Sequence, residues 1–149
     1  MDLVTIKNTM KRELKQRIMG KTSYGNYQWK KADNEWYGSI HDANLSTHEN
    51  FVSYLKEKSD IKTVLEVGCG TGIYPIKNKE IFTDLNYTGL DISNENIDFC
   101  KQNSSFNFIC GDIIQINLND KYDLVYSHAV IDHVYDIDRF VSKIGRAHV

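Results

Sequence analysis

The sequence is poor in cysteine and proline, two residue types that stiffen or cross-link small domains. It has one proline and three cysteines in 149 residues. Cys69, Cys100 and Cys110 are odd in number and show no CxxC spacing, which argues against a disulfide framework and against a zinc site. Free thiols fit a reducing compartment, so we expect a cytoplasmic protein without a bound metal.

Long hydrophobic runs are also missing, and the N-terminus has no apolar segment of the kind found in signal peptides. We therefore expect neither a secretory leader nor a membrane span. Positive and negative charges nearly balance over the whole chain, which has a formal net charge of -2. They are unevenly distributed, because residues 1–31 carry six net positive charges. The remaining residues form an acidic body, to which this basic arm is attached.

The arm has two parts. Apolar residues recur at helical spacing up to Gly20, which predicts an amphipathic helix. Residues 21–43 break that period and gather aromatic side chains, which stack on nucleic-acid bases, form the wall of a small-molecule pocket, or fill the interface between the arm and the body. We favour the pocket wall or the packing role over base stacking. Residues 1–45 are assigned to a helical arm, whose key residues are Leu3, Ile6, Met10, Leu14, Ile18, Tyr24, Tyr27, Trp29, Trp36, Tyr37 and His41.

The most informative stretch is TVLEVGCGTG, residues 63–72. Its apolar residues are typical of a buried parallel strand, and Gly68, Gly70 and Gly72 predict a tight turn that a ligand can approach closely. Glu66 is unusual because a carboxylate in so apolar a run needs a partner, which a positive or hydroxyl-bearing ligand would supply. We expect this strand, turn and helix start to bind a cofactor.

Strands and helices alternate through the rest of the chain. Ser46 or Thr47 is expected to cap a helix that ends near Lys58, and helices are predicted over residues 73–82, after Ser93, and over residues 137–144. Strands are expected at residues 87–92, 106–110 and 122–127. This alternation predicts an α/β fold with a Rossmann-like, doubly wound parallel sheet in residues 46–143.

Polar residues follow the carboxyl ends of the predicted strands: Glu66, Asp91, Asp112, and Ser127 with His128. In doubly wound sheets, ligands bind at this edge. Asp91 is suited to accept hydrogen bonds from a ribose diol, and Asp112, beside Gly111, from an exocyclic adenine amine. A dinucleotide-binding dehydrogenase has a similar layout, but the spacing here is GxGxG, so its GxGxxG fingerprint is not met. Glu66 before the turn, together with Gly111 and Asp112 at the third strand, favours a cationic adenosyl ligand over a pyrophosphate.

These motifs resemble those of the class I S-adenosylmethionine-dependent methyltransferases. The resemblance covers residues 62–144 and rests on VLEVGCGTG, GLDIS (89–93), Gly111 with Asp112, and YDLVYS (122–127) with IDHV (131–134). It implies that S-adenosyl-L-methionine is the cofactor. The cofactor-binding residues that it implies are Glu66, Gly68, Cys69, Gly70, Gly72, Asp91, Ile92, Gly111, Asp112, Ile113 and Ser127.

The same resemblance implies methyl transfer to an O, N, C or S nucleophile. His128 is the first candidate to orient or deprotonate the acceptor, and His133 is a weaker one. No Asn/Asp-Pro-Pro-aromatic motif and no Pro-Cys pair follows the fourth strand, so we expect a small-molecule acceptor rather than nucleic acid. The alternatives are a non-catalytic adenosyl-, RNA- or protein-binding module, and an NAD-linked oxidoreductase.

The end of the chain is unusual for this family, because only four of the seven strands that the resemblance implies are present. Residues 144–149 also match the translation of a sequencing adapter in one reading frame. We therefore expect the natural protein to continue past Lys143, with the last six residues as an adapter-derived tail. Such a fragment would keep cofactor residues and lack part of the catalytic unit.

Overall fold

The computed structural model describes residues 45–148. The basic helix and the aromatic segment expected in residues 1–44 lie outside this part of the chain, so those expectations stay predictions. Within residues 45–148, no helix is long and apolar enough to cross a membrane.

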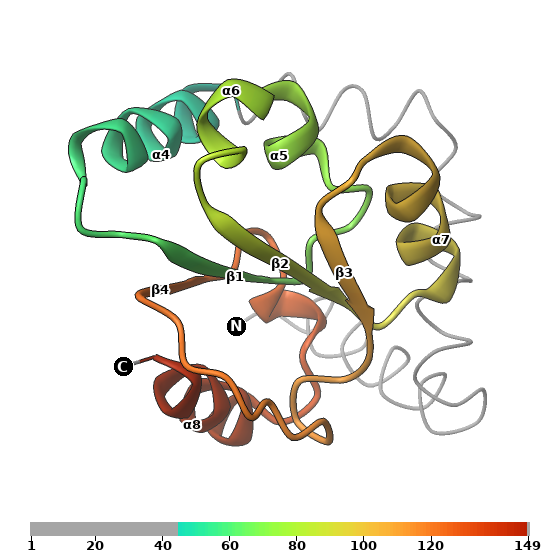
Figure 1. Ribbon diagram of the computed structural model, residues 1–149. Coiled ribbons are helices and arrows are strands. Elements are labelled where there is room, and N and C mark those ends of the chain that lie inside the picture. The colour runs from blue at the N-terminus through green and yellow to red at the C-terminus, as the bar shows by residue number, and fades with distance from the viewer. Residues whose placement is uncertain (1–44, 149) are drawn as a thin grey trace.

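The centre of the fold is a four-stranded parallel sheet (Figure 1). Its order is β3-β2-β1-β4, so the chain moves outward in one direction from β1 and then crosses back to the other side of it. This reversal beside β1 is the topological switch point at which ligands bind in such sheets. The strands are β1 (Thr63–Val67), β2 (Asn86–Asp91), β3 (Asn107–Cys110) and β4 (Leu124–Tyr126).

Helices cover both faces of the sheet, which confirms the doubly wound α/β fold. Residues of α4, α5, α6 and α7 pack in one buried cluster, and α8 packs in a second cluster on the opposite face (Figure 1). The helices are α4 (Leu45–Glu57), α5 (Ile73–Lys77), α6 (Lys79–Phe82), α7 (Asn94–Asn103) and α8 (Ile137–Ala147), with a short 3-10 helix, η1 (Ile131–His133), before α8.

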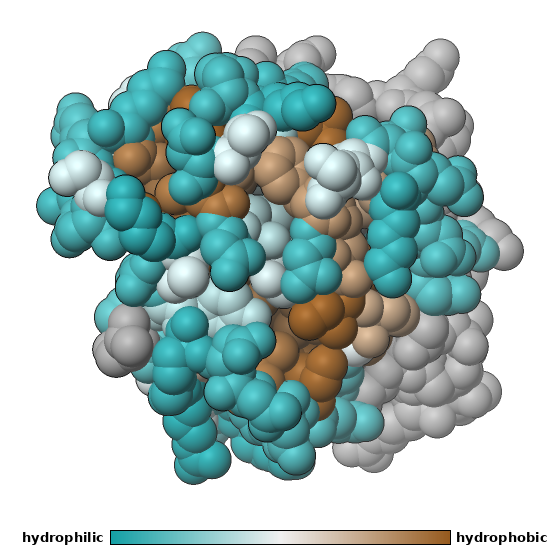
Figure 2. Space-filling view, viewed as in Figure 1, coloured by the Kyte–Doolittle hydropathy of each residue, from teal (hydrophilic) through white to brown (hydrophobic). Residues whose placement is uncertain are grey.

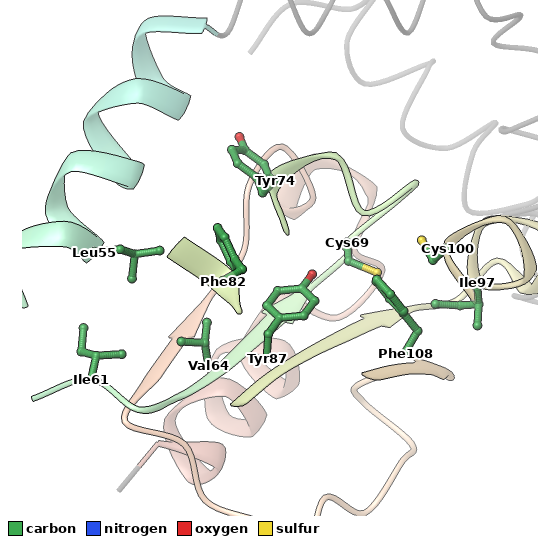
Figure 3. Close-up of a cluster of buried hydrophobic side chains, with 10 residues drawn as sticks. All are labelled: Leu55, Ile61, Val64, Cys69, Tyr74, Phe82, Tyr87, Ile97, Cys100 and Phe108. Carbon is green, nitrogen blue, oxygen red and sulfur yellow. The ribbon is translucent and has the colours of Figure 1, made fainter. Parts of the chain in front are cut away.

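The alternation of side chains along β1 divides the core. Val64 faces the α4 side, where Phe82, Tyr87 and Phe108 join it (Figure 3), while Leu65 and Val67 face α8. Burial on both faces explains why β1 reads as a continuous apolar run. The outer surface is mostly hydrophilic, with hydrophobic residues visible between the sheet and the helices in the view of Figure 2.

Several element boundaries differ from the sequence prediction. The helix expected over residues 73–82 is split at Asn78, whose side-chain Nδ2 donates to the Tyr74 carbonyl at 2.9 Å and competes with the helical hydrogen bonds. The helix expected after Ser46 or Thr47 is α4, which already includes both residues from Leu45 onward, so neither is its N-cap and that prediction was wrong.

The C-terminal half shows a shorter strand and a longer helix than expected. β4 has three residues, and Tyr122 instead forms an isolated parallel bridge with His148. α8 continues to Ala147, which is buried against the sheet. The Ser93 cap is confirmed, since its Oγ accepts from the Asn96 N–H at 3.3 Å.

Gly89 in the middle of β2 gives a test of this packing. A Cβ at this position would lie 2.7 Å from Phe108 Cδ1 and 2.9 Å from Cys69 Sγ. We predict that Gly89→Ala lowers the free energy of unfolding by about 1–3 kcal/mol, the usual cost of overpacking a core. Urea denaturation followed by circular dichroism measures it.

Gly145→Ala is the matched control, because no residue in the described part of the chain lies within 4 Å of its added Cβ on α8. This variant should be neutral or slightly more stable, since alanine is the better helix former. Equal unfolding midpoints for the two variants would contradict the packing described for β2.

Candidate active site

The glycine turn after β1 is tied to the end of β2 by three backbone N–H groups. Gly68 and Cys69 donate to the Leu90 carbonyl at 2.7 and 3.1 Å, and Gly70 donates to Asp91 Oδ2 at 2.8 Å. Gly68, Gly70 and Gly72 have φ values of 81°, 54° and 65°, in the left-handed region that glycine adopts without strain. The turn therefore has one fixed shape, anchored at the sheet edge.

The glycines differ in what surrounds them. A Cβ at Gly68 would lie 2.2 Å from Val130 Cγ2, so the loop after β4 packs directly on this residue. A Cβ at Gly70 would meet nothing within 4 Å among the described residues. The backbone at Gly70 thus borders open space beside Asp91, the arrangement expected where a ligand approaches the main chain.

Asp91 stands at the end of β2 and organises both the turn and α7. Besides Gly70, its carboxylate accepts from the Ser93 N–H at 2.8 Å and from Asn96 Nδ2 at 3.4 Å. Burial raises the pKa of Asp91, and the hydrogen bonds from Ser93, Gly70 and Asn96 act against that shift. Asn96 Oδ1 is buried without a hydrogen-bond partner in the described structure, so an acceptor beside Asp91 is available for a hydrogen bond.

Glu66 has a protein partner that the sequence did not indicate. Tyr87 Oη donates to Glu66 Oε2 at 2.5 Å from the neighbouring strand β2. Burial raises the pKa of Glu66 from 4.5 to about 7, the hydroxyls of Tyr87 and Tyr126 oppose the shift, and the charge on Asp91 adds to it. The buried Glu66 and the half-buried Asp91 therefore lie near each other, and no cation is among the groups that set the pKa of Glu66.

The thiols of Cys69 and Cys100 lie beneath the turn, and their side chains approach each other in Figure 3. Cys100 Sγ donates to the Gly70 carbonyl at 3.3 Å. The hydrogen bond with Cys100, together with burial, raises the pKa of the Cys69 thiol above its usual range. A protonated, buried thiol is a poor nucleophile, so Cys69 contributes packing and backbone position rather than covalent chemistry.

The remaining cofactor-binding candidates lie beside the glycine turn and Asp91, after the carboxyl ends of β2 and β3. After β3, Asp112 accepts from Tyr135 Oη at 3.1 Å and from the Ile114 N–H at 3.0 Å, and the Gly111 N–H bonds to the Asp91 carbonyl at 2.8 Å. Ile92 is half-buried, and Ile113 is buried in the cluster facing α8.

The loop after β4 carries both histidine candidates. Ser127 Oγ donates to the Val67 carbonyl at 2.8 Å, and the adjacent His128 Nδ1 pairs with Tyr74 Oη at 2.9 Å. His133 is exposed in η1. Within residues 45–148, no group of His, Cys, Asp and Glu residues could hold a metal ion.

The structure thus brings Glu66, the glycines, Asp91 and Ser127 with His128 to one edge of the sheet, with Asp112 beside them. It adds Tyr74, Tyr87, Tyr126 and Asn96, which the sequence did not single out. Tyr87 reaches Glu66 only because β1 and β2 pair in a register that sets Glu66 opposite Gly89. That register is not readable from the sequence.

Comparison with known proteins agrees with this geometry. A family model described as "Methyltransferase domain" matches residues 65–148, more than half of the chain. The chain therefore belongs to the methyltransferase domain family, and the resemblance to class I S-adenosylmethionine-dependent methyltransferases is confirmed. Glu66, the glycine turn (residues 68–72) and the polar residues at the strand ends all lie within the matched segment.

Individual relatives show the same family. The chain is 37% identical over 81 residues to a malonyl-[acyl-carrier protein] O-methyltransferase of Calditerrivibrio nitroreducens, covering 54% of this chain and 31% of that protein. It is 32% identical over 89 residues to a fatty-acid O-methyltransferase of Mycolicibacterium smegmatis, covering 57% and 32%. The chain thus matches about a third of the length of these relatives.

Among solved structures, the plantazolicin methyltransferase BpumL, in complex with a pentazolic desmethylPZN analog and SAH, has the same fold. The TM-score is 0.71 at 20% identity, over 100% of this chain and 58% of that chain. At this identity the likeness establishes the fold, so the roles of individual residues rest on the geometry described above.

The raised pKa of Glu66 predicts a pH dependence of stability. The folded state holds the proton up to about pH 7, whereas the unfolded state releases it near 4.5. The folded state therefore binds more protons between these values, and stability should fall as pH rises through this window. Relative to Glu66→Gln, wild type should lose about 3 kcal/mol between pH 4.5 and pH 8.

Urea denaturation of both proteins across this pH range measures the difference. Glu57→Gln is the control, because Glu57 is exposed at the end of α4. Parallel stability curves for wild type and Glu66→Gln would contradict the described environment of Glu66.

Proposed function

We propose that this chain binds S-adenosyl-L-methionine at the carboxyl edge of β1 and β2 and forms the cofactor-binding part of a small-molecule methyltransferase. One observation carries the proposal: the glycine turn is fastened to Asp91, and no described residue lies within 4 Å of a Cβ built at Gly70. Family membership of residues 65–148 supports it.

The residues fit the cofactor by charge and by shape. The carboxylates of the buried Glu66 and the half-buried Asp91 favour a cationic ligand, and the backbone at Gly70 permits close approach. Asp91 Oδ2 accepts one backbone N–H in the described structure, which leaves it room to accept from a ribose hydroxyl. Asp112 stands beyond the end of β3, where an adenine amine would be recognised; the remaining assigned contacts are Gly68, Cys69, Gly72, Ile92, Gly111, Ile113 and Ser127.

The bound cofactor supplies an electrophilic methyl group on a sulfonium, whose positive charge disappears as the methyl is transferred. The chain's own contribution is to hold the two reactants in line and to keep water away. Such positioning is worth up to about 7–11 kcal/mol in intramolecular models. His128, on the loop packed against Gly68, lies on the acceptor side; His133, exposed in η1, is the second candidate.

The relatives suggest which acceptors to test. The names of two of them, a malonyl-[acyl-carrier protein] and a fatty-acid O-methyltransferase, both specify acids as acceptors. We therefore propose a small-molecule acceptor bearing a carboxylate, and place the reaction in the cytoplasm, where the free thiols of Cys69, Cys100 and Cys110 stay reduced.

Calorimetry tests the cofactor assignment. S-adenosylmethionine and S-adenosylhomocysteine should bind the chain, and NAD should not. Asp91→Asn should weaken binding about 10- to 100-fold, because the carboxylate's charged hydrogen bonds are lost. Asp98→Asn, on the exposed face of α7, is the matched control and should bind like wild type.

Two results would contradict the proposal. One is the absence of binding of both adenosyl ligands by a folded chain, and the other is equal affinity in Asp91→Asn. If the full-length protein binds the adenosyl ligands but transfers no methyl group from labelled cofactor to malonyl-acyl carrier protein, palmitate or an amino sugar, that result would instead support a non-catalytic binding module.

A further inference from the structure

Tyr74 and His128 form a hydrogen-bonded pair that the cofactor assignment does not use. Tyr74 Oη lies 2.9 Å from His128 Nδ1, and the two rings meet edge to face at 88° with centroids 5.8 Å apart. Tyr74 belongs to α5, directly after the glycine turn, and His128 follows β4. The pair therefore joins the two segments that enclose the switch point of the sheet.

The position of the Tyr74 ring is fixed by its neighbours. It contacts the rings of Phe51 on α4 and Tyr126 on β4 edge to face, with centroids 6.1 and 6.3 Å away, and is 7% exposed. In Figure 3 Tyr74 stands at the border of the buried cluster, with its hydroxyl directed away from the other labelled side chains. A ring packed by side chains of two other elements, α4 and β4, can hold its hydroxyl in one place.

The loop that carries His128 is held on both sides of this residue. Ser127 Oγ bonds to the end of β1, and the side chain of Val130 packs on Gly68. Between them, Ala129 has a φ of 53°, a conformation that costs a non-glycine residue about 1–2 kcal/mol. Strain of this kind persists only where the surroundings enforce it, and it is concentrated at functional sites.

Nε2 of His128 has no hydrogen-bond partner among residues 45–148. Cε1 separates Nε2 from Nδ1 in the ring, and the two nitrogens direct their hydrogen bonds outward in different directions, so the bond from Nδ1 to Tyr74 turns Nε2 away from Tyr74. Burial and the charge on Glu66 raise the pKa of Tyr74 to about 12, which keeps its hydroxyl protonated and able to donate. A hydroxyl that donates to Nδ1 leaves the proton of the neutral ring on Nε2.

We propose that Tyr74 is a positioning residue that holds His128 in the Nε2–H tautomer, so that Nε2 donates a hydrogen bond to the carboxylate oxygen of the methyl acceptor. This rests on the proposed function and adds how its acceptor is recognised. Transfer to a carboxylate forms a C–O bond, breaks the methyl–sulfur bond and releases no proton, so His128 need only orient the acceptor. A hydroxyl or amine acceptor would need a base, which this tautomer cannot supply at Nε2.

Nitrogen-15 NMR of the histidine ring tests the tautomer without any acceptor. Wild type should show a protonated Nε2 and an unprotonated, hydrogen-bonded Nδ1 at His128 when the ring is neutral. In Tyr74→Phe, which keeps the packed ring and loses the hydroxyl, the Nδ1 signal should shift and both tautomers should be populated. Tyr54→Phe, at an exposed position on α4, should leave the spectrum unchanged.

Kinetics of the natural full-length protein with labelled cofactor test the link to the acceptor, with malonyl-acyl carrier protein and palmitate as carboxylate probes. Tyr74→Phe should lower kcat/KM for the carboxylate about tenfold, while the affinity for S-adenosylhomocysteine stays within about twofold of wild type. His128→Ala should lose about 10- to 100-fold, the range of one hydrogen bond to a charged group.

Each of the two experiments has a result that overturns the inference. An Nδ1–H tautomer in wild type, or an identical His128 spectrum in Tyr74→Phe, would refute the positioning role. Unchanged kcat/KM in Tyr74→Phe, or an equal loss of cofactor affinity, would show that the pair does not act on the acceptor. Failure of wild type to methylate either probe counts against the proposed acceptor class, and the NMR result then decides the tautomer independently.

Discussion

The candidate site depends on the attachment of the glycine turn to the end of β2. The N–H groups of Gly68, Cys69 and Gly70 all point at acceptors on Leu90 and Asp91, so the turn cannot move without breaking backbone hydrogen bonds. Only glycine combines the positive φ angles with the contact of Val130 at Gly68. One short segment thus sets the relative positions of β1, β2, α7 and the loop after β4.

That attachment has an electrostatic cost. It gathers the carboxylates of Glu66 and Asp91 at a buried edge, where desolvation raises the pKa of each. The tyrosine hydroxyl of Tyr87 and the N–H groups of Gly70 and Ser93 offset part of this cost in the folded chain. A cationic ligand would offset more, which links the way β1 and β2 fold to the ligand charge that the site favours.

The sequence predicted the parts of the fold that depend on local pattern. The buried strand β1, the turn, the Ser93 cap and the parallel α/β alternation follow from apolar runs, glycines and capping residues. The pairs that depend on register or on distant packing were not predictable: Tyr87 with Glu66, and Tyr74 with His128, are separated by 21 and 54 residues. The break at Asn78 was missed because a side chain competing for one carbonyl leaves no periodic signal.

A crystal structure of the chain with S-adenosylhomocysteine tests the central claim most directly. The account predicts ribose hydroxyls within hydrogen-bonding distance of Asp91, the amino-acid part of the ligand along residues 68–72, and a glycine turn still bonded to Leu90 and Asp91. A ligand bound away from the carboxyl edge of β1 and β2, or a ribose that makes no contact with Asp91, would contradict it.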